Sequence, residues 1–170
     1  EFRFDTVLWD VDGAMACYPS NLIPHYPGMK DWLDAGNDFL PHVIAGSRDR
    51  GLEVFLSFRV NPGQDPNFDS VSFKDENEDR LLNFNEDPNG PPQLYFKRLD
   101  GEVNQQKWDY ADPTVRAYQL SALRELAAYD IDGIHLDFAR HAPYVHVGHQ
   151  WELRDHVTQF MREVRSMMQQ

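Results

Sequence analysis

The chain of 170 residues is long enough for one domain with a buried core, and 41% hydrophobic with 26% charged residues is a globular composition. A formal net charge of −12 leaves no basic surface to neutralise phosphates, which argues against nucleic acid or an anionic membrane as partner. The single cysteine excludes an internal disulfide, and no apolar run approaches the roughly 20 residues of a membrane-spanning helix.

The first predicted element is a strand at Thr6–Asp12, TVLWDVD, which ends in Asp-x-Asp-Gly. An apolar strand with this ending resembles the first motif of haloacid-dehalogenase-type phosphatases. The resemblance implies that Asp10 is a nucleophile and Asp12 an acid/base. However, Ala14 stands where that family usually has Thr after the Asp-Gly, and only one acid, Asp137, ends the last strand. Such a phosphatase, using magnesium, is therefore the second alternative function.

Strands and helices alternate along the rest of the chain. Gly51 is a stop signal for the first helix, and Asp112-Pro113 combines a good N-cap with proline at the first helical position. Apolar residues recur at helical spacing after each of the last two helix starts. The further predicted elements are a helix within Asn37–Arg50, a strand at Leu52–Asn61, a helix at Pro113–Ala128, a strand at Gly133–Ala139 and a helix at Trp151–Met168.

One long insertion interrupts this alternation at residues 62–107, which are rich in Asp, Asn, Pro and Gly. Loops of this length inside a compact domain are usually functional or disordered. The carboxylates have no EF-hand spacing, so a solvated acidic loop is predicted in preference to a calcium site.

The order of elements predicts parallel α/β architecture, with 1–170 forming one unit. Each predicted strand has one apolar face, and its opposite face becomes polar toward the carboxyl end. This pattern fits a (β/α)8 TIM-barrel type, in which helices cover the outside and the carboxyl-end rim holds the site. The predicted rim residues are Asp10, Asp12, Arg59, Asn61, His135 and Asp137. A structural ion-pair network remains the alternative to a functional site.

Several stretches together resemble bacterial family-10-like glycosyl hydrolases, which are glycosidase-like (β/α)8 proteins and often secreted. They are YDIDGIHLDFARH (Tyr129–His141), GLEVFLSFRVNP (Gly51–Pro62), YADPTVRAYQLSALRELA (Tyr110–Ala127), WELRDHVTQFMREV (Trp151–Val164) and YPSN (Tyr18–Asn21). The resemblance implies a partial barrel, about strands two to four with their helices. It also implies an extracellular or periplasmic location, although no signal peptide is visible. The expected partner is the remainder of a longer chain or a self-associating copy.

The stretch GIHLDFARH also distantly resembles the strand-four signature of α-amylases. That resemblance implies Asp137 as the nucleophile, with Arg140 and His141 at the positions of a Lys-His pair. His135 replaces the arginine that usually steadies the nucleophile, so the amylase mechanism does not transfer directly.

Glycoside hydrolysis generally needs two carboxyl groups across the scissile bond. Asp137 is the candidate nucleophile or base, and Asp12 is either the acid or a ligand of a sugar hydroxyl. Trp108 and Tyr110 are either stacking platforms for a sugar or packing residues. The predicted substrate-binding residues are Asp10, Arg59, Asn61, His135, Arg140, His141 and Tyr144.

The predicted function is therefore a glycoside hydrolase acting on a poly- or oligosaccharide, with no cofactor. Four histidines fall within His135–His149, but no short metal-binding motif joins them, so a metal site is not predicted. The first alternative is a non-catalytic carbohydrate-binding barrel remnant, because fold does not fix function and the general acid is not identified.

Overall fold

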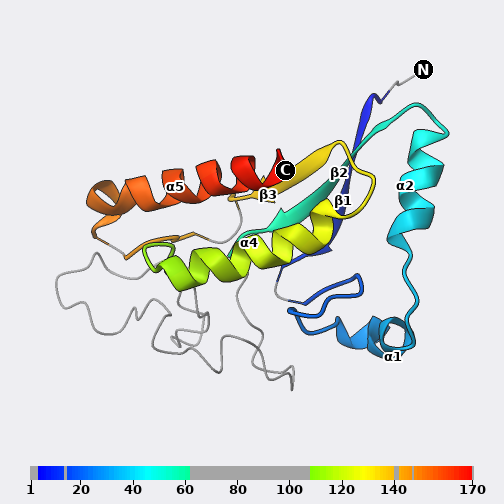
Figure 1. Ribbon diagram of the computed structural model, residues 1–170, viewed down its shortest axis with the longest axis horizontal. Coiled ribbons are helices and arrows are strands. Elements are labelled where there is room, and N and C mark those ends of the chain that lie inside the picture. Colours follow the sequence, from blue (N-terminus) through cyan, green and yellow to red (C-terminus); the bar gives the residue numbers. More distant parts are fainter. Residues whose placement is uncertain (1–3, 14, 62–107, 140–141, 147, 170) are drawn as a thin grey trace, which may run out of the picture.

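The computed structural model describes residues 4–13, 15–61, 108–139, 142–146 and 148–169. They form a mixed α/β arrangement around a parallel sheet (Figure 1). The predictions for the 62–107 insertion and for Arg140 and His141 lie outside the described residues. The elements are β1 (Thr6–Asp12), the 3-10 helix η1 (Pro27–Met29), α1 (Lys30–Asp34), α2 (Leu40–Arg48), β2 (Glu53–Arg59), α4 (Pro113–Ala127), β3 (Gly133–Asp137) and α5 (Gln150–Met168).

The predicted helix boundaries have local causes that the structure confirms. The carboxylate of Asp112 accepts a hydrogen bond of 2.7 Å from the backbone N–H of Thr114, and Pro113 begins α4. Gly51 follows α2 with φ of +72°, a left-handed conformation that glycine adopts without strain. The short helices η1 and α1 were not predicted.

The sheet has the order β1-β2-β3, and all its strands are parallel. The register between β1 and β2 shifts between Asp10 and Asp12, so β1 has a bulge near its carboxyl end. Gly13 lies directly after this irregularity. A Cβ atom on Gly13 would stand 2.1 Å from the backbone oxygen of Arg59, so only glycine fits there.

The hydrophobic core lies on one face of the sheet, as the alternation in each strand predicts. In β2 the buried positions are Val54, Leu56 and Phe58, and they belong to one cluster with residues of α2, α4 and α5. Figure 1 shows α4 and α5 side by side along the sheet, and the two helices are in contact. A sheet whose described helices share one face has the layer order of a barrel wall.

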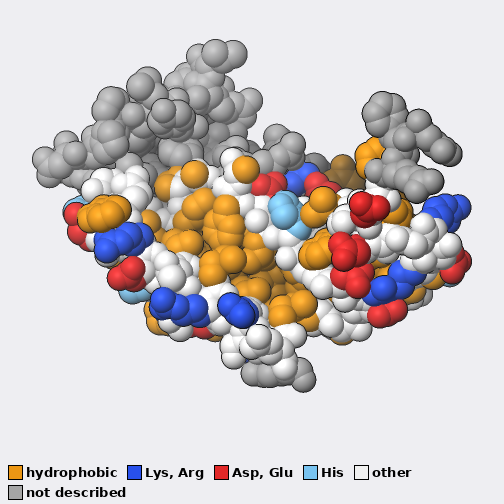
Figure 2. All heavy atoms as spheres, turned by 90° about the horizontal axis from the view of Figure 1, so that it is seen from above, with side chains coloured by type: hydrophobic (Ala, Val, Ile, Leu, Met, Phe, Trp, Pro, Cys, Tyr) orange, Lys and Arg blue, Asp and Glu red, His pale blue; other side chains and the backbone are white. Residues whose placement is uncertain are grey.

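The opposite face of the sheet is open in the described part of the chain. Leu8 is 53% exposed there, next to Phe55 on β2. Gly133 completes this row, and a Cβ atom on it would stand 2.6 Å from Cε1 of Phe55, so the phenyl ring lies over the glycine. Figure 2 shows a band of hydrophobic side chains across the molecule, with charged and histidine side chains beside it.

Candidate functional site

Asp10 and Arg59 form an ion pair on the open face, near the carboxyl ends of β1 and β2. Nη2 of Arg59 lies 2.5 Å from Oδ2 of Asp10, and the side chains are 25% and 51% exposed, respectively. A pair with this exposure contributes little to stability because water screens it. Both side chains therefore remain accessible to solvent, and their role in binding a ligand stays a prediction.

Ser57 and His135 form a second contact, one strand further along. Oγ of Ser57 lies 2.9 Å from Nδ1 of His135, and the imidazole is exposed. The strand register places Asp10 opposite Ser57 and Ser57 opposite His135. These three side chains thus form one row across the sheet, directly above the apolar row of Leu8 and Phe55.

Asp137 is the last residue of β3, and the register places it opposite Arg59. Its side chain is half-buried, and Oδ1 accepts a hydrogen bond of 2.9 Å from the backbone N–H of Ala139. The contact fixes the direction of the carboxylate without removing it from solvent. The structure brings four predicted rim residues to the same end of one sheet face: Asp10, Arg59, His135 and Asp137.

The bulge in β1 alters which strand position Asp12 occupies. Strand alternation predicts that Asp12 shares a face with Asp10, but the register shift pairs Asp12 with Phe58, whose side chain belongs to the core. Simple alternation therefore does not carry across this point. The side chain of Asp12 lies outside the described residues, so its role as acid or sugar ligand stays a prediction.

The structure corrects the predicted position of Asn61. The side chain is fully buried rather than at an open rim, because β2 already ends at Arg59. Its Oδ1 accepts a bond of 2.8 Å from the N–H of Trp108, and Nδ2 donates to the carbonyl oxygens of Pro143 (2.8 Å) and Trp108 (3.3 Å). Asn61 joins two distant segments of the chain and is structural.

The aromatic residues near the carboxyl end mostly pack. Trp108 is 3% exposed, and Tyr110 is fully buried with its hydroxyl donating to the carbonyl oxygen of Val60 at 2.5 Å, so neither is a platform for a sugar. Tyr144 is half-buried, with its ring edge-on to Tyr110 and its hydroxyl donating to the carbonyl oxygen of Phe138 at 2.5 Å. Its sugar-binding role stays a prediction.

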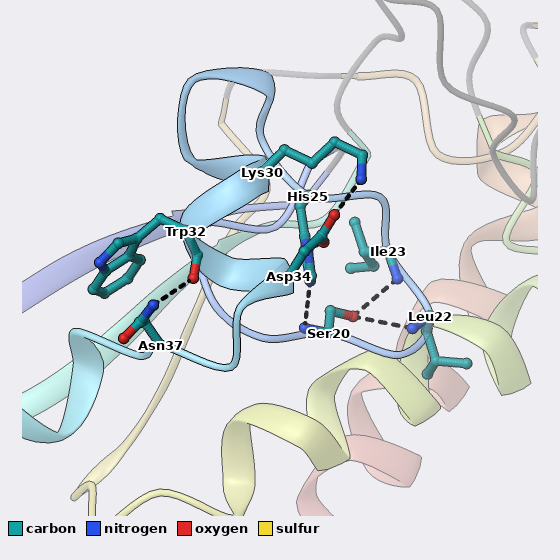
Figure 3. Close-up of polar contacts among 8 residues, drawn as sticks. All are labelled: Ser20, Leu22, Ile23, His25, Lys30, Trp32, Asp34 and Asn37. Carbon is teal, nitrogen blue, oxygen red and sulfur yellow. Dashed lines mark hydrogen bonds and ion pairs between the residues drawn. The ribbon is translucent and has the colours of Figure 1, made fainter.

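A second polar cluster, which the sequence analysis missed, holds the loop after β1 (Figure 3). The backbone N–H of Ser20 donates to Nε2 of His25 at 3.1 Å, and Nδ1 of His25 lies 2.6 Å from Oδ1 of Asp34. Lys30 also pairs with Asp34, and this hydrogen bond is the main reason that the pKa of the Asp34 carboxyl is lowered. The His25 contact is the second reason.

This cluster has the residue types of a nucleophile–base pair without its geometry. The imidazole of His25 meets the backbone of Ser20, whereas the Ser20 hydroxyl donates to Oε2 of Glu125 on α4 at 2.5 Å. A serine nucleophile needs its own hydroxyl against the base. The cluster is therefore a clamp that fastens the loop to α1 and α4.

The described residues contain no group of three or more histidine, cysteine, aspartate or glutamate side chains placed to hold a metal ion. Within the same residues, no helix combines the length and apolar character needed to cross a membrane.

Comparison with known proteins gives likeness in structure. No protein-family model and no curated protein matches the sequence. The chain is similar to alpha-L-fucosidase isoenzyme 2 from Paenibacillus thiaminolyticus, with a TM-score of 0.65 and 14% identity over 96% of this chain and 25% of that chain. It is also similar to a hypothetical protein from Ruminiclostridium thermocellum, with a TM-score of 0.58 and 13% identity over 97% of this chain and 79% of that one.

A third similar structure is the glycoside hydrolase domain of PelA from Pseudomonas aeruginosa, with a TM-score of 0.51 and 16% identity over 96% of this chain and 55% of that chain. Two of the three structures are thus glycoside hydrolases, and the chain has a glycosidase-like fold. It spans about a quarter of the length of the fucosidase. The likeness does not single out family 10.

Proposed function

We propose that the chain is part of a glycoside hydrolase acting on a poly- or oligosaccharide, with Asp137 as its central carboxylate. The observation that carries this proposal is the position of Asp137 at the carboxyl end of β3, opposite Arg59 on the open face. In barrels, catalytic groups lie at this end of the strands. The glycosidase-like fold supports the same reaction class.

In this proposal Asp137 is the nucleophile or the base, and the Asp10–Arg59 pair and His135 hold sugar hydroxyls. Carboxylate oxygens accept hydrogen bonds from hydroxyl groups, and the guanidinium donates to them. The second carboxyl is Asp12 or a residue of another segment of a longer chain. Its separation from Asp137 sets the stereochemistry, about 5–5.5 Å for retention and about 6.5–9.5 Å for inversion.

The family resemblance, and the share of the fucosidase that the chain covers, also support proposals about the barrel, the location and the substrate. The chain supplies about strands two to four of a (β/α)8 barrel, and a longer chain or a second copy supplies the rest. The protein acts outside the cytoplasm, in the extracellular space or the periplasm. The fucosidase likeness makes α-L-fucosides natural members of the substrate panel.

The test is hydrolysis of a panel of p-nitrophenyl glycosides and polysaccharides by the full chain. Asp137→Asn should lower the rate by at least about 10²-fold, because it removes an acid/base or nucleophilic group but keeps the shape. Asp155→Asn is the matched control, since Asp155 is exposed on α5 and its ion pair with Arg154 is long, at 3.9 Å. Equal rates for both variants would contradict the role of Asp137.

A carbohydrate-binding protein without catalysis is the second candidate. One observation favours it. On the described part of the open face Asp10 is paired with Arg59, so Asp137 is the main candidate for a catalytic carboxyl. Glycoside hydrolysis generally needs two such groups. Glycan-array binding that survives Asp137→Asn, with no turnover of any glycan by the unmodified chain, would establish it. Magnesium-dependent hydrolysis of p-nitrophenyl phosphate would instead support the phosphatase alternative.

A further inference from the structure

Ser57 occupies the centre of the open face. It lies in the middle of β2, between Asp10 on β1 and His135 on β3. Its side chain is half-buried, and its hydroxyl oxygen is 2.9 Å from Nδ1 of His135. One nitrogen of the exposed imidazole is thus hydrogen-bonded to a side chain of the neighbouring strand.

This contact has two possible directions, and both have the same consequence for the other nitrogen. When the Ser57 hydroxyl donates to Nδ1, the proton of the neutral ring is on Nε2, which then donates. When Nδ1 donates to the Ser57 hydroxyl, Nε2 is left as an acceptor. In either case the serine holds Nδ1 of the ring, which leaves Nε2 as the nitrogen that can meet a ligand.

A sugar hydroxyl both donates and accepts, so it suits either state of Nε2. His135 and Asp137 are two residues apart on β3 and share one face of the sheet. A hydroxyl held by His135 would therefore belong to a sugar ring next to the Asp137 carboxylate. A side chain that bonds the far nitrogen of a ligand-binding histidine in this way sets its ring orientation.

We propose that Ser57 is a positioning residue that presents Nε2 of His135 to a carbohydrate hydroxyl beside Asp137. The assignment of the ligand rests on the glycoside hydrolase function proposed above. The orientation of His135 does not rest on it. The two parts are tested by different measurements.

The orientation is tested by ¹⁵N NMR of the histidine side chains in the full chain and in Ser57→Ala and Ser57→Thr. The Nδ1 signal of His135 should have a hydrogen-bonded shift in the unmodified chain, move toward the shift of a solvent-exposed ring in Ser57→Ala, and return in Ser57→Thr. His25 is an internal control, because Ser20 and Asp34 hold its two nitrogens far along the chain from Ser57 (Figure 3). An unchanged His25 signal shows that the fold around it is intact. A His135 Nδ1 signal unaffected by Ser57→Ala would overturn the proposal.

The ligand is tested with the p-nitrophenyl glycosides of the substrate panel. Ser57→Ala should raise KM by a few-fold to about tenfold with little change in kcat, because a contact to a hydroxyl away from the reacting bond binds ground state and transition state alike. Unchanged KM, kcat and pH profile in an active enzyme would overturn this part. If NMR shows the Ser57-dependent hydrogen bond at Nδ1 but the unmodified chain hydrolyses no glycoside, the glycosidase function fails and the positioning of His135 stands.

Discussion

Main-chain crowding explains why the last residue of the Asp-x-Asp-Gly stretch, Gly13, is a glycine. A Cβ on Gly13 would lie 2.1 Å from the backbone oxygen and 3.1 Å from the backbone carbon of Arg59. These are atoms of the neighbouring strand, which cannot turn aside as a flexible side chain does. Sheet geometry at the bulge of β1 thus accounts for the glycine, and phosphate chemistry is not needed to explain it.

Gly13→Ala should therefore destabilise the protein, by about 2–3 kcal/mol, because the sheet has to move apart to admit the methyl group. Gly46→Ala is the matched control. Gly46 lies inside α2, and its added Cβ would meet only Nη1 of Arg50 at 3.6 Å, so this change should stabilise by about 0.5–1 kcal/mol. Urea unfolding followed by circular dichroism measures both. Equal effects of the two substitutions would be incompatible with crowding at Gly13.

Strand alternation was enough to place some site residues but not others. It correctly assigned Asp10, Arg59 and His135 to the open face, because the face of a residue inside a strand depends only on its position. It failed for Asn61, which follows the end of β2 and bonds to residues 47 and 82 positions away in sequence. No periodic pattern within one element contains such contacts.

Among the elements, α4 owes its start to one side chain. Asp112 caps the helix through its 2.7 Å bond from the N–H of Thr114. The first N–H groups of a helix have no acceptor within the helix, and a capping carboxylate accepts a hydrogen bond from one of them. Since α4 packs on β3 and α5, a weakened start affects the layer behind the site.

Asp112→Ala should lower the free energy of unfolding by about 1 kcal/mol, the usual cost of losing an N-cap. Asp112→Ser should retain most of the stability, because a serine oxygen accepts the same hydrogen bond. Denaturant midpoints of the two variants give the comparison. An alanine variant as stable as the serine variant would show that the cap is not needed.

The elements that were missed are short or irregular. The helix α1 has five residues, and periodicity cannot be recognised over so short a stretch. Its position depends on the burial of Leu33 and on the contact of Asp34 with His25, which lies outside the helix, whereas the Lys30–Asp34 pair is local to α1. The long strands and helices, by contrast, carry their pattern in their own sequence and were predicted within a few residues.

At the scale of the whole molecule, four tyrosines respond to alkaline pH in the same way: Tyr18, Tyr110, Tyr118 and Tyr129. Burial raises the pKa of each phenol above its usual value, and for Tyr118 the pKa is about 12. The unfolded chain has tyrosine pKa values near 10, so it releases these protons first as the pH rises. The stability that depends on the neutral phenols is present below about pH 10 and is lost above it.

The protein should therefore unfold more easily above about pH 10, by about 1 kcal/mol for the first pH unit for each of Tyr18, Tyr110 and Tyr118, and by less for the half-buried Tyr129. Tyr118→Phe should make this loss smaller, because phenylalanine has no proton to release. Thermal unfolding across an alkaline pH series measures the slope. Parallel slopes for the unmodified protein and Tyr118→Phe would contradict the assignment.

The sequence predicted the class of architecture because strands and helices alternate in order and each strand has one apolar face. It predicted a glycosidase-like chain from the stretch around Asp137, and the structural likeness supports that. It left Asp12 open between the acid and a sugar ligand, and strand alternation alone does not place Asp12, because the bulge there depends on how β1 pairs with β2. Such a register shift belongs to the pair of strands rather than to either one.

The two ends of the described sheet have a consequence for assembly. The outer strands β1 and β3 run parallel, so their free edges are different surfaces. A contact between the β3 edge of one molecule and the β1 edge of the next would be head-to-tail and would lack twofold symmetry. Such contacts continue into a filament unless the rotation closes a ring. The net charge of −12 opposes that growth, since each added molecule brings the same charge.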